Sequence, residues 1–272
     1  KISNKLKYRK ILKRFKLKQP PFYEKLNKDI IKKKIITKPK YGSGSENIFF
    51  VKNIESLSKH NYFEEFIENG EMFALDGFCI KRKFIPIALS KKNKYKDNVF
   101  IDKTIEFNFQ NYPILDKASK IVQKHCNIFK IENSPIHFEF LIKDQNFFSI
   151  DFHLRGPGSR IYSYLINKLI KPSPYQIQKS DENIKNLKIN KNFYCYIFFI
   201  NNIYELKYIK KIIKNSNLLF KFINFRKREL KESNLESTRS RVGAYYFIFN
   251  NKIDFEKKSK YLNNKFKESC FI

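Results

Sequence analysis

Two acidic residues, Glu139 and Asp151, lie inside segments that are otherwise apolar. The segments 136–142 (IHFEFLI) and 147–152 (FFSIDF) predict two strands of a hairpin, joined by a turn at 143–146. A carboxylate among large apolar side chains is costly unless a cation or a hydrogen-bond donor faces it. Two carboxylates that face one groove would suit Mg²⁺, which proteins hold with one or two carboxylates together with phosphate oxygens. The alternative is that both belong to the polar face of an amphipathic hairpin.

The polar face continues beyond the second of these segments. Side chains at alternate positions of an extended chain point to the same side, so Asp151, His153 and Arg155 share one side. His137 shares a side with Glu139 for the same reason. A lone histidine is more often structural than catalytic, so His137 receives only a supporting role.

A second candidate site is the loop Gly42-Ser43-Gly44-Ser45, which separates two short apolar runs. The runs predict short strands, and the glycines allow the chain between them to turn tightly and direct N–H groups outward. Such a loop can hold a phosphate group, and Lys38 just before it adds a compact positive charge. The order differs from that of a P-loop, in which Lys follows the glycines and a helix begins. A plain β-hairpin with a Gly/Ser turn is an equally weighted alternative.

Glycine placement connects the two candidate sites. The chain has only seven glycines. Gly42 and Gly44 lie in the loop, and Gly156 and Gly158 come just after Arg155. In a chain this poor in glycine, two pairs beside candidate phosphate and metal groups are harder to ascribe to ordinary turns.

The remaining sequence predicts the elements that must position these groups. Apolar residues at helical spacing predict helices over the ranges 1–15, 25–34, 114–126, 161–169, 206–213 and 255–266. Apolar runs bounded by turns predict a strand and a turn within 62–71, and strands at 72–80, 84–89, 193–200 and 242–249. Residues 54–59 predict a short helix or a turn.

Composition limits the class of protein. At 272 residues, 42% of them hydrophobic, the chain can form one large domain or two modest ones. The net charge of +30 first suggests a nucleic-acid or anionic-membrane partner. The excess is mostly Lys scattered among Asn, Ile, Phe and Tyr, which is typical of an A+T-rich genome. We therefore interpret the charge as a solvated surface and do not expect a nucleic-acid partner.

Cysteine use and hydropathy indicate the compartment. Four widely spaced cysteines, with no Cys-x-x-Cys pair, predict reduced thiols and a cytoplasmic protein. No apolar run approaches the length of a membrane span and nothing resembles a signal peptide, so we expect no membrane partner. The first residue is Lys rather than Met, which suggests a fragment or a processed chain. A homodimer is the default expectation for assembly.

In their order along residues 1–160, these motifs resemble the ATP-grasp superfamily, and in particular its carboxylate–amine ligases. The segments that carry the resemblance are Asn4–Arg9 with Gln19-Pro20, Lys38-Pro39 with Gly42–Ser45, Glu64–Ile67 with Glu71 and Leu75–Gly77, His137–Phe140, and Ile150–Gly156. Asn4 takes the place of the usual Asp before Lys5, and His153 takes the place of the usual Asn.

The resemblance implies an ATP site. Lys5 and Lys38 would contact the α- and β-phosphates. The loop that would close over the terminal phosphates comprises Gly42, Ser43, Gly44 and Ser45. The adenine-binding segment would be Glu64, Glu65, Phe66 and Ile67, with the backbone of Glu65 and Ile67 and the side chain of Glu64 around the base. Glu71 would bind the ribose hydroxyls.

The resemblance also implies a metal site and a reaction. Glu139, Asp151 and His153 would bind Mg²⁺, for which Mn²⁺ could substitute. Arg155 would be the catalytic residue that stabilises an acyl phosphate and the tetrahedral species that follows it. With ATP and Mg²⁺ as cofactors, the enzyme would join a small-molecule carboxylate to a small-molecule amine and release ADP and phosphate.

The implied architecture is an α+β ATP-grasp fold, in which two α+β subdomains grip ATP between antiparallel sheets. We expect the ATP-grasp domain at 1–175 and a small C-terminal α/β subdomain at 176–272. Within the first, the expected parts are a helical lead-in at 1–34, a nucleotide-binding sheet with the phosphate loop at 35–90, and a metal-binding subdomain at 91–175. Family members normally carry a further N-terminal α/β domain, which we expect to be missing from this chain.

Three alternatives to the ligase remain open. Within enzymes, the chain could be an ATP-grasp carboxylase or another phosphoryl-transfer member, and only the acceptor chemistry separates these. Outside enzymes, it could be a degenerate, non-catalytic ATP-grasp module. It could also be a basic nucleic-acid-binding protein, whose binding would weaken steeply with salt.

Overall fold

The computed structural model describes residues 3–52, 61–95, 98–108, 111–177, 179, 181–214, 218–225 and 241–267. The helix or turn expected at 54–59 lies outside them.

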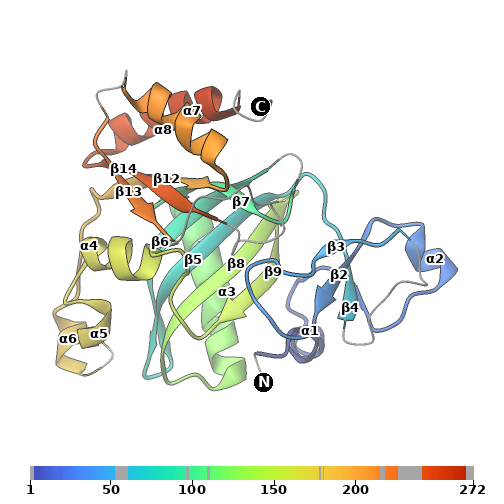
Figure 1. Ribbon diagram of the computed structural model, residues 1–272. Helices are drawn as coiled ribbons and strands as arrows, with labels where there is room; N and C mark the ends of the chain where they lie inside the picture. The colour runs from blue at the N-terminus through green and yellow to red at the C-terminus, as the bar shows by residue number, and fades with distance from the viewer. Residues whose placement is uncertain are drawn as a thin grey trace.

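Two antiparallel sheets form the framework of the chain (Figure 1). The smaller sheet has the strand order β1-β4-β2-β3, with β1 (Phe22–Tyr23), β2 (Ile35–Pro39), β3 (Phe49–Phe50) and β4 (Asn61–Glu65). The larger sheet has the order β13-β14-β12-β7-β6-β5-β8-β9. Its strands are β5 (Glu71–Ile80), β6 (Lys83–Lys94), β7 (Asp102–Phe107), β8 (Asn133–Lys143), β9 (Asn146–His153), β12 (Tyr194–Ile200), β13 (Phe220–Asn224) and β14 (Gly243–Phe249). A separate pair is formed by β10 (Ile170–Lys171) and β11 (Lys188–Ile189).

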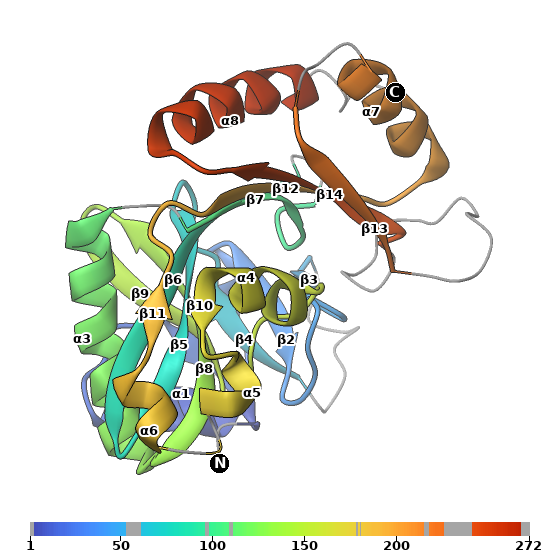
Figure 2. The same ribbon diagram turned by 90° about the vertical axis from the view of Figure 1, so that its left-hand side faces the viewer.

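Helices cover both faces of the larger sheet (Figures 1 and 2). The helices of the described residues are α1 (Lys5–Arg14), α2 (Lys28–Ile31), α3 (Tyr112–Phe129), a π-helix (Ile161–Ile166), α4 (Asn167–Leu169), α5 (Pro174–Ile177), α6 (Asp181–Lys185), α7 (Ile203–Lys214) and α8 (Lys252–Lys267). Of these, α2 lies beside the smaller sheet (Figure 1). Figure 2 shows α7 and α8 on one side of β12 and β14, with α4 on the opposite side. Among the described residues, no helix is both long enough and apolar enough to span a bilayer.

Strand alternation divides the side chains of the larger sheet between a core and a polar face. On β5, Phe73 and Leu75 pack in a core with residues of α1 and α3. Ala74 and Asp76, between and after them, face a cavity instead. The same alternation on β8 buries Phe138 in this core, so that the charged side chains of the sheet gather on the cavity face.

The C-terminal strands are apolar on both faces because each face is covered. All seven residues of β12 are buried. Ile197 and Phe199 belong to the core beside the π-helix and α4, whereas Tyr196 and Phe198 pack under α7 and α8. This explains why β12 reads as a continuous apolar run rather than an alternating one.

Most elements expected from the sequence are confirmed. The strands at 193–200 and 242–249 appear as β12 and β14, and the acidic segments form the hairpin of β8 and β9. The sequence analysis predicts no strand at β7 or β13. β7 reads DKTIEF, and its polar first half, including Asp102 and Lys103, is nevertheless buried. Neighbouring strands supply ion-pair partners that the sequence pattern of β7 alone does not reveal.

The expected domain boundaries do not coincide with the edge of a sheet. The division at 90 and 91 falls inside β6, and β12 of the tail pairs with β7 in the larger sheet. The larger sheet therefore runs continuously from the middle of the chain into the tail. The division into subdomains stays a prediction.

Arg9 joins the two sheets. It lies on α1, between the sheets in Figure 1, and is 1% exposed. Its Nε donates to Glu64 Oε1 of β4 over 2.6 Å, while its two Nη atoms donate to the carbonyls of Ser149 and Ile150 on β9 over 2.6 and 2.8 Å. One buried guanidinium thus holds the smaller sheet, α1 and the edge strand of the larger sheet together, with all three of its nitrogens in use.

Glu64 is the anion at the centre of this contact. Its Oε1 also accepts from the Tyr62 hydroxyl over 2.7 Å, and its Oε2 lies 3.2 Å from Lys38 Nζ. Burial by itself raises the pKa of Glu64, but the charges of Arg9 and Lys38 and the hydrogen bonds outweigh it and hold the pKa at about 2. The carboxylate therefore stays ionised in the folded chain at neutral pH.

Replacing Arg9 should destabilise the fold strongly. Arg9→Met leaves the Glu64 carboxylate with Lys38 as its remaining ionic partner, so the free energy of unfolding should fall by about 3–5 kcal/mol. Urea denaturation measures this difference. Arg82→Met is the matched control, because Arg82 pairs with Glu132 on the surface and should cost less than about 1 kcal/mol. Equal losses in the two variants would contradict the joining role of Arg9.

Acid should weaken the same contact in a defined window. The pKa of Glu64 is lower in the folded than in the unfolded chain, so its contribution is present above the ordinary value of 4.5 and is lost as pH falls towards about 2. The melting temperature followed by circular dichroism should therefore drop across this window. In Glu64→Gln, which cannot titrate there, the drop should be smaller. Parallel curves for the two proteins would show that Glu64 does not contribute.

Candidate functional site

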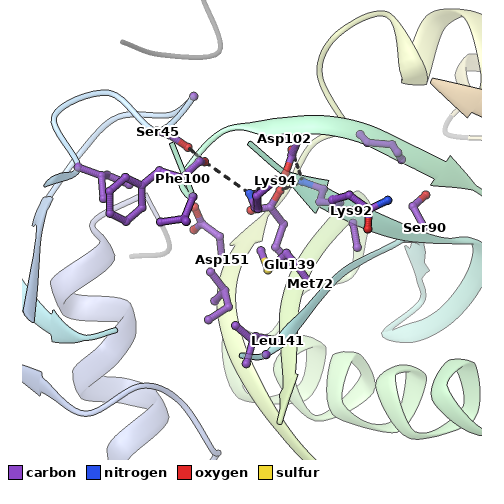
Figure 3. Close-up of a pocket in the computed structure, with 18 of the residues that line it drawn as sticks. Ser45, Met72, Ser90, Lys92, Lys94, Phe100, Asp102, Glu139, Leu141 and Asp151 are labelled. Carbon is purple, nitrogen blue, oxygen red and sulfur yellow. Dashed lines mark hydrogen bonds and ion pairs between the residues drawn. The ribbon is translucent and has the colours of Figure 1, made fainter. Parts of the chain in front are cut away.

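A cavity of about 880 Å³ is lined by residues of both sheets (Figure 3). Each site residue predicted from the sequence lines this cavity, with the exception of Gly42. Those near the smaller sheet are Lys5, Lys38, Ser43, Gly44, Ser45, Glu64, Glu65, Phe66 and Ile67. Those on or just after strands of the larger sheet are Glu71, Glu139, Asp151, His153 and Arg155. The fold thus brings the two groups of predicted residues to one place.

The Gly/Ser loop is the turn of a hairpin, because β2 and β3 pair antiparallel through Ile36 and Phe50. Gly42 has φ +123° and Gly44 has φ +75°, conformations that favour glycine. Gly42 shapes the turn outside the cavity. The hydroxyl of Ser45 donates to the carbonyl of Phe100 over 2.7 Å, which holds the loop against the segment between β6 and β7.

Lys38 lies at the base of the cavity beside this loop. It is 6% exposed, and its Nζ faces the Glu64 carboxylate. Burial lowers the pKa of Lys38 and is only partly offset by the negative charge of Glu64. The side chain of Glu64, which the sequence places near adenine, has both oxygens engaged in ion pairs with Arg9 and Lys38.

The segment after β4 forms an aromatic wall. The ring of Phe66 lies edge-on to that of Phe50, with centroids 5.0 Å apart, and 6.1 Å from that of Phe100. The N–H of Phe66 donates to the Lys34 carbonyl over 2.8 Å. Glu71, at the start of β5, pairs with Lys91 at the exposed rim of the cavity. A flat apolar surface next to a carboxylate at the rim suits a base and a ribose.

Glu139 and Asp151 face each other across β8 and β9, in the register that alternation predicts. Each has a lysine partner: Lys92 Nζ pairs with Glu139 Oε1, and Lys5 Nζ lies 3.1 Å from Asp151 Oδ2. Burial raises the pKa of both carboxyl groups, but the lysines and neighbouring histidines lower it further, to well below the ordinary range. Both groups are therefore carboxylates at neutral pH.

The donor set fits a hard cation through two carboxylates rather than three ligands. No group of three or more His, Cys, Asp and Glu side chains suited to a metal ion occurs among the described residues. His153 Nε2 instead lies 3.3 Å from Asp151 Oδ2. Mg²⁺ needs only one or two protein carboxylates when phosphate oxygens complete its shell. The assignment of Glu139, Asp151 and His153 to Mg²⁺ stays a prediction.

His137 supports Glu139 from within the same strand. Its Nδ1 lies 2.7 Å from Asp76 Oδ1 and its Nε2 lies 3.3 Å from Glu139 Oε1. Burial lowers the pKa of His137, but the charge and hydrogen bond of Asp76, together with Glu139, raise it to about 9. The ring is therefore an imidazolium at neutral pH, and it can donate to both carboxylates.

Sequence reasoning missed several charged residues of the cavity. Lys92 Nζ also lies 3.2 Å from Asp102 Oδ2, and Lys94 Nζ lies 2.6 Å from Asp102 Oδ1 (Figure 3). The alternation of Ser90, Lys92 and Lys94 along one strand was a signal that could have found the two lysines. Arg241, which also lines the cavity, had no such signal, because strand pairing of the tail brings it there.

Comparisons with known proteins bear on the fold. Residues 2–127 match the family model described as an ATP-grasp domain. No curated protein sequence matches the chain. Among solved structures, the chain is similar to an L-amino acid ligase from Bacillus licheniformis, with a TM-score of 0.73 and 16% identity over 97% of this chain and 71% of that one.

Two further solved structures share the fold. One is N5-carboxyaminoimidazole synthetase from Staphylococcus aureus complexed with ADP, with a TM-score of 0.68 and 14% identity over 98% of this chain and 72% of that one. The other is a biotin carboxylase–ATP-analogue complex from Campylobacter jejuni, with a TM-score of 0.62 and 14% identity over 94% of this chain and 65% of that one. The chain therefore has the ATP-grasp fold, and residues 2–127 of it match the model of an ATP-grasp domain.

Proposed function

We propose that the protein is an ATP-dependent ligase that joins a carboxylate to an amine through an acyl phosphate and releases ADP and phosphate. The observation that carries this proposal is the pair Glu139 and Asp151, which share one cavity with the Gly/Ser loop and with Lys5 and Lys38. Carboxylates that stay ionised beside a basic phosphate-binding loop are the groups that phosphoryl transfer from a nucleotide requires. The similarity to the L-amino acid ligase also supports it.

The nucleotide would lie along the smaller sheet. Its base would rest against Phe66 between the backbone of Glu65 and Ile67, and its ribose would bind Glu71. The triphosphate would extend past Lys38 towards the Gly/Ser loop, whose backbone N–H groups would hold the terminal phosphates. Ser45 already fixes this loop through the carbonyl of Phe100.

The chemistry has two displacements. An oxygen of the substrate carboxylate attacks the γ-phosphorus, the bond to the β–γ bridging oxygen breaks, and ADP leaves. The amine then attacks the acyl carbon, loses a proton, and displaces phosphate. Mg²⁺ held by Glu139 and Asp151 with phosphate oxygens would offset the charge on the transferred group. Arg155, just beyond β9, would stabilise the anionic tetrahedral species of the second step.

Lys5 and Lys92 would change partners during this cycle. They now balance the charges of Asp151 and Glu139, respectively. A cation that binds the two carboxylates would release both lysines from these pairs. Lys5, on the first turn of α1, would then be able to contact a phosphate. The lysines keep the carboxylates ionised and in place until the nucleotide arrives.

Mg²⁺-ATP should stabilise the folded chain. A ligand that binds only the native state adds about 2.7 kcal/mol at a concentration of 100 Kd, so the melting temperature should rise. Lys38→Ala should abolish the rise, because the charge that faces the phosphates is lost. Lys10→Ala is the control, since Lys10 pairs with Glu24 on the exposed side of α1. Retention of the shift in Lys38→Ala would mean that ATP binds elsewhere.

Arg155→Ala should separate binding from chemistry. The variant should keep the Mg²⁺-ATP shift but lose at least about 100-fold in kcat, the loss typical when one donor to a developing oxyanion is removed. Turnover is measured as ADP release with panels of carboxylic acids and amines, and hydroxylamine serves to trap the acyl phosphate as a hydroxamate.

The same assay distinguishes the alternatives. ADP release that depends on bicarbonate, with no hydroxamate from any other carboxylate, would indicate a carboxylase. An ATP-induced shift without ADP release under any condition would indicate a non-catalytic module. A variant Arg155→Ala with unchanged kcat would contradict the role of that arginine.

A further inference from the structure

Arg241 reaches the cavity from the C-terminal part of the chain. It lies two residues before β14 and is 4% exposed. Its guanidinium carbon lies 3.6 Å from the centroid of the Phe199 ring on β12. Its Nη2 donates to the Asp102 carbonyl over 2.6 Å, and its Nη1 lies 3.3 Å from Ser159 Oγ. Stacking and two hydrogen bonds therefore fix the plane of the group.

Among the described residues, the third nitrogen of this guanidinium, Nε, has no hydrogen-bond partner. In the part of the chain that the structure describes, Arg241 Nε is the only buried side-chain N–H group in that condition. An unpaired buried donor on a cation is costly, and native proteins leave few of them. Since Arg241 lines the cavity, a ligand there is a natural partner for Nε.

The charges around Arg241 leave room for an anion. Contacts lead from Asp102 to Lys92 and Lys94, and from Lys92 to Glu139. In the described part of the chain, the three cations Lys92, Lys94 and Arg241 lie near two carboxylates, Asp102 and Glu139. His137, which contacts both Asp76 and Glu139, and Asp76 add one charge of each sign and leave this balance unchanged. Among the described residues, one positive charge thus lacks a counter-charge, and burial lowers the pKa of Arg241 in its present surroundings.

The anion that fits here is not the one that reacts with ATP. The contacts of Arg241 with described residues come from β7, β12 and the segment after β9, and in that part of the chain none comes from the smaller sheet or the Gly/Ser loop. The carboxylate that accepts the phosphoryl group must lie between that loop and the pair Glu139 and Asp151. Arg241 is nevertheless near the reaction centre. It contacts Asp102, Asp102 pairs with Lys92, and Lys92 pairs with Glu139.

We propose that Arg241 binds an oxyanion of the amine substrate, so that the acceptor of this ligase is an amine that also carries a carboxylate or a phosphate. The inference rests on the proposed function. Guanidinium groups recognise both oxyanions through the same donors, and apolar side chains at this end, Phe199, Ile105 and Ile161, would contact the rest of the molecule. Arg241 would act as a specificity residue, while Arg155 serves the chemistry.

Matched probes test the oxyanion directly. Binding to the wild-type protein with Mg²⁺-ADP is measured by calorimetry for L-amino acids against their carboxamides, and for phosphoethanolamine against ethanolamine. Each pair shares the amine and differs in the oxyanion. We expect at least one anionic probe to bind about tenfold or more tightly than its uncharged counterpart, as one good ionic contact supplies. Preference within the amino acid pairs would identify a carboxylate, and preference for phosphoethanolamine would identify a phosphate.

Variants tie the preference to Arg241. Arg241→Gln should abolish the difference between paired probes, and Arg241→Lys should retain part of it because the charge remains. Arg82→Gln, an exposed arginine paired with Glu132, should leave it unchanged. The proposal is overturned if the wild-type protein binds both members of every pair equally. It is also overturned if Arg241→Gln keeps the preference.

A hydroxylamine readout separates this inference from the proposed function. Hydroxylamine replaces the acceptor, so hydroxamate formation by Arg241→Gln should stay within about twofold of the wild type while the KM of the anionic amine rises. Loss of hydroxamate formation in this variant would place Arg241 on the carboxylate donor and overturn the proposal. If the wild type forms no hydroxamate but its preference for the oxyanion depends on Arg241, the proposed ligase reaction is contradicted. The oxyanion site at Arg241 is then still supported.

Discussion

The buried ion pair between Arg9 and Glu64 is the contact on which the rest of the structure depends. The Glu64 carboxylate is 1% exposed and needs cationic partners, because an unpaired buried charge is costly. Arg9 of α1 and Lys38 of β2 are these partners. Because Arg9 also donates to two carbonyls of β9, the requirement to neutralise Glu64 fixes the smaller sheet against the larger one. The walls of the cavity, and hence the spacing between loop and carboxylates, follow from this one charge.

The cavity extends the same principle of paired charge. Asp151, Glu139 and Asp102 each have a lysine partner, so that their charges are kept without any bound ion. In the function that we propose, these carboxylates would bind a hard cation and the lysines would then contact phosphates. A site built from exchangeable ion pairs can be assembled during folding and can rearrange when ligands bind, with little change in the backbone.

The tail is part of this site rather than an appendage. Because β12 pairs with β7, the larger sheet continues into the C-terminal strands, and the segment before β14 reaches Asp102. Two cores on opposite faces of β12 hold that connection rigidly. A guanidinium stacked on Phe199 therefore has a defined position relative to Glu139, as a residue that selects a substrate requires.

The sequence by itself determined the local helices and strands and the side chains that are candidates for a functional site. Strand alternation paired Glu139 with Asp151, glycine spacing located the Gly/Ser loop, and the order of these motifs indicated the ATP-grasp fold. These features are local, because periodicity and turn chemistry act within a few residues. Only the tertiary structure decided which cation pairs with which carboxylate, that the polar strand β7 is buried, and that Arg241 lines the cavity. Those outcomes depend on contacts between residues that are far apart in the chain, and no sequence period records them.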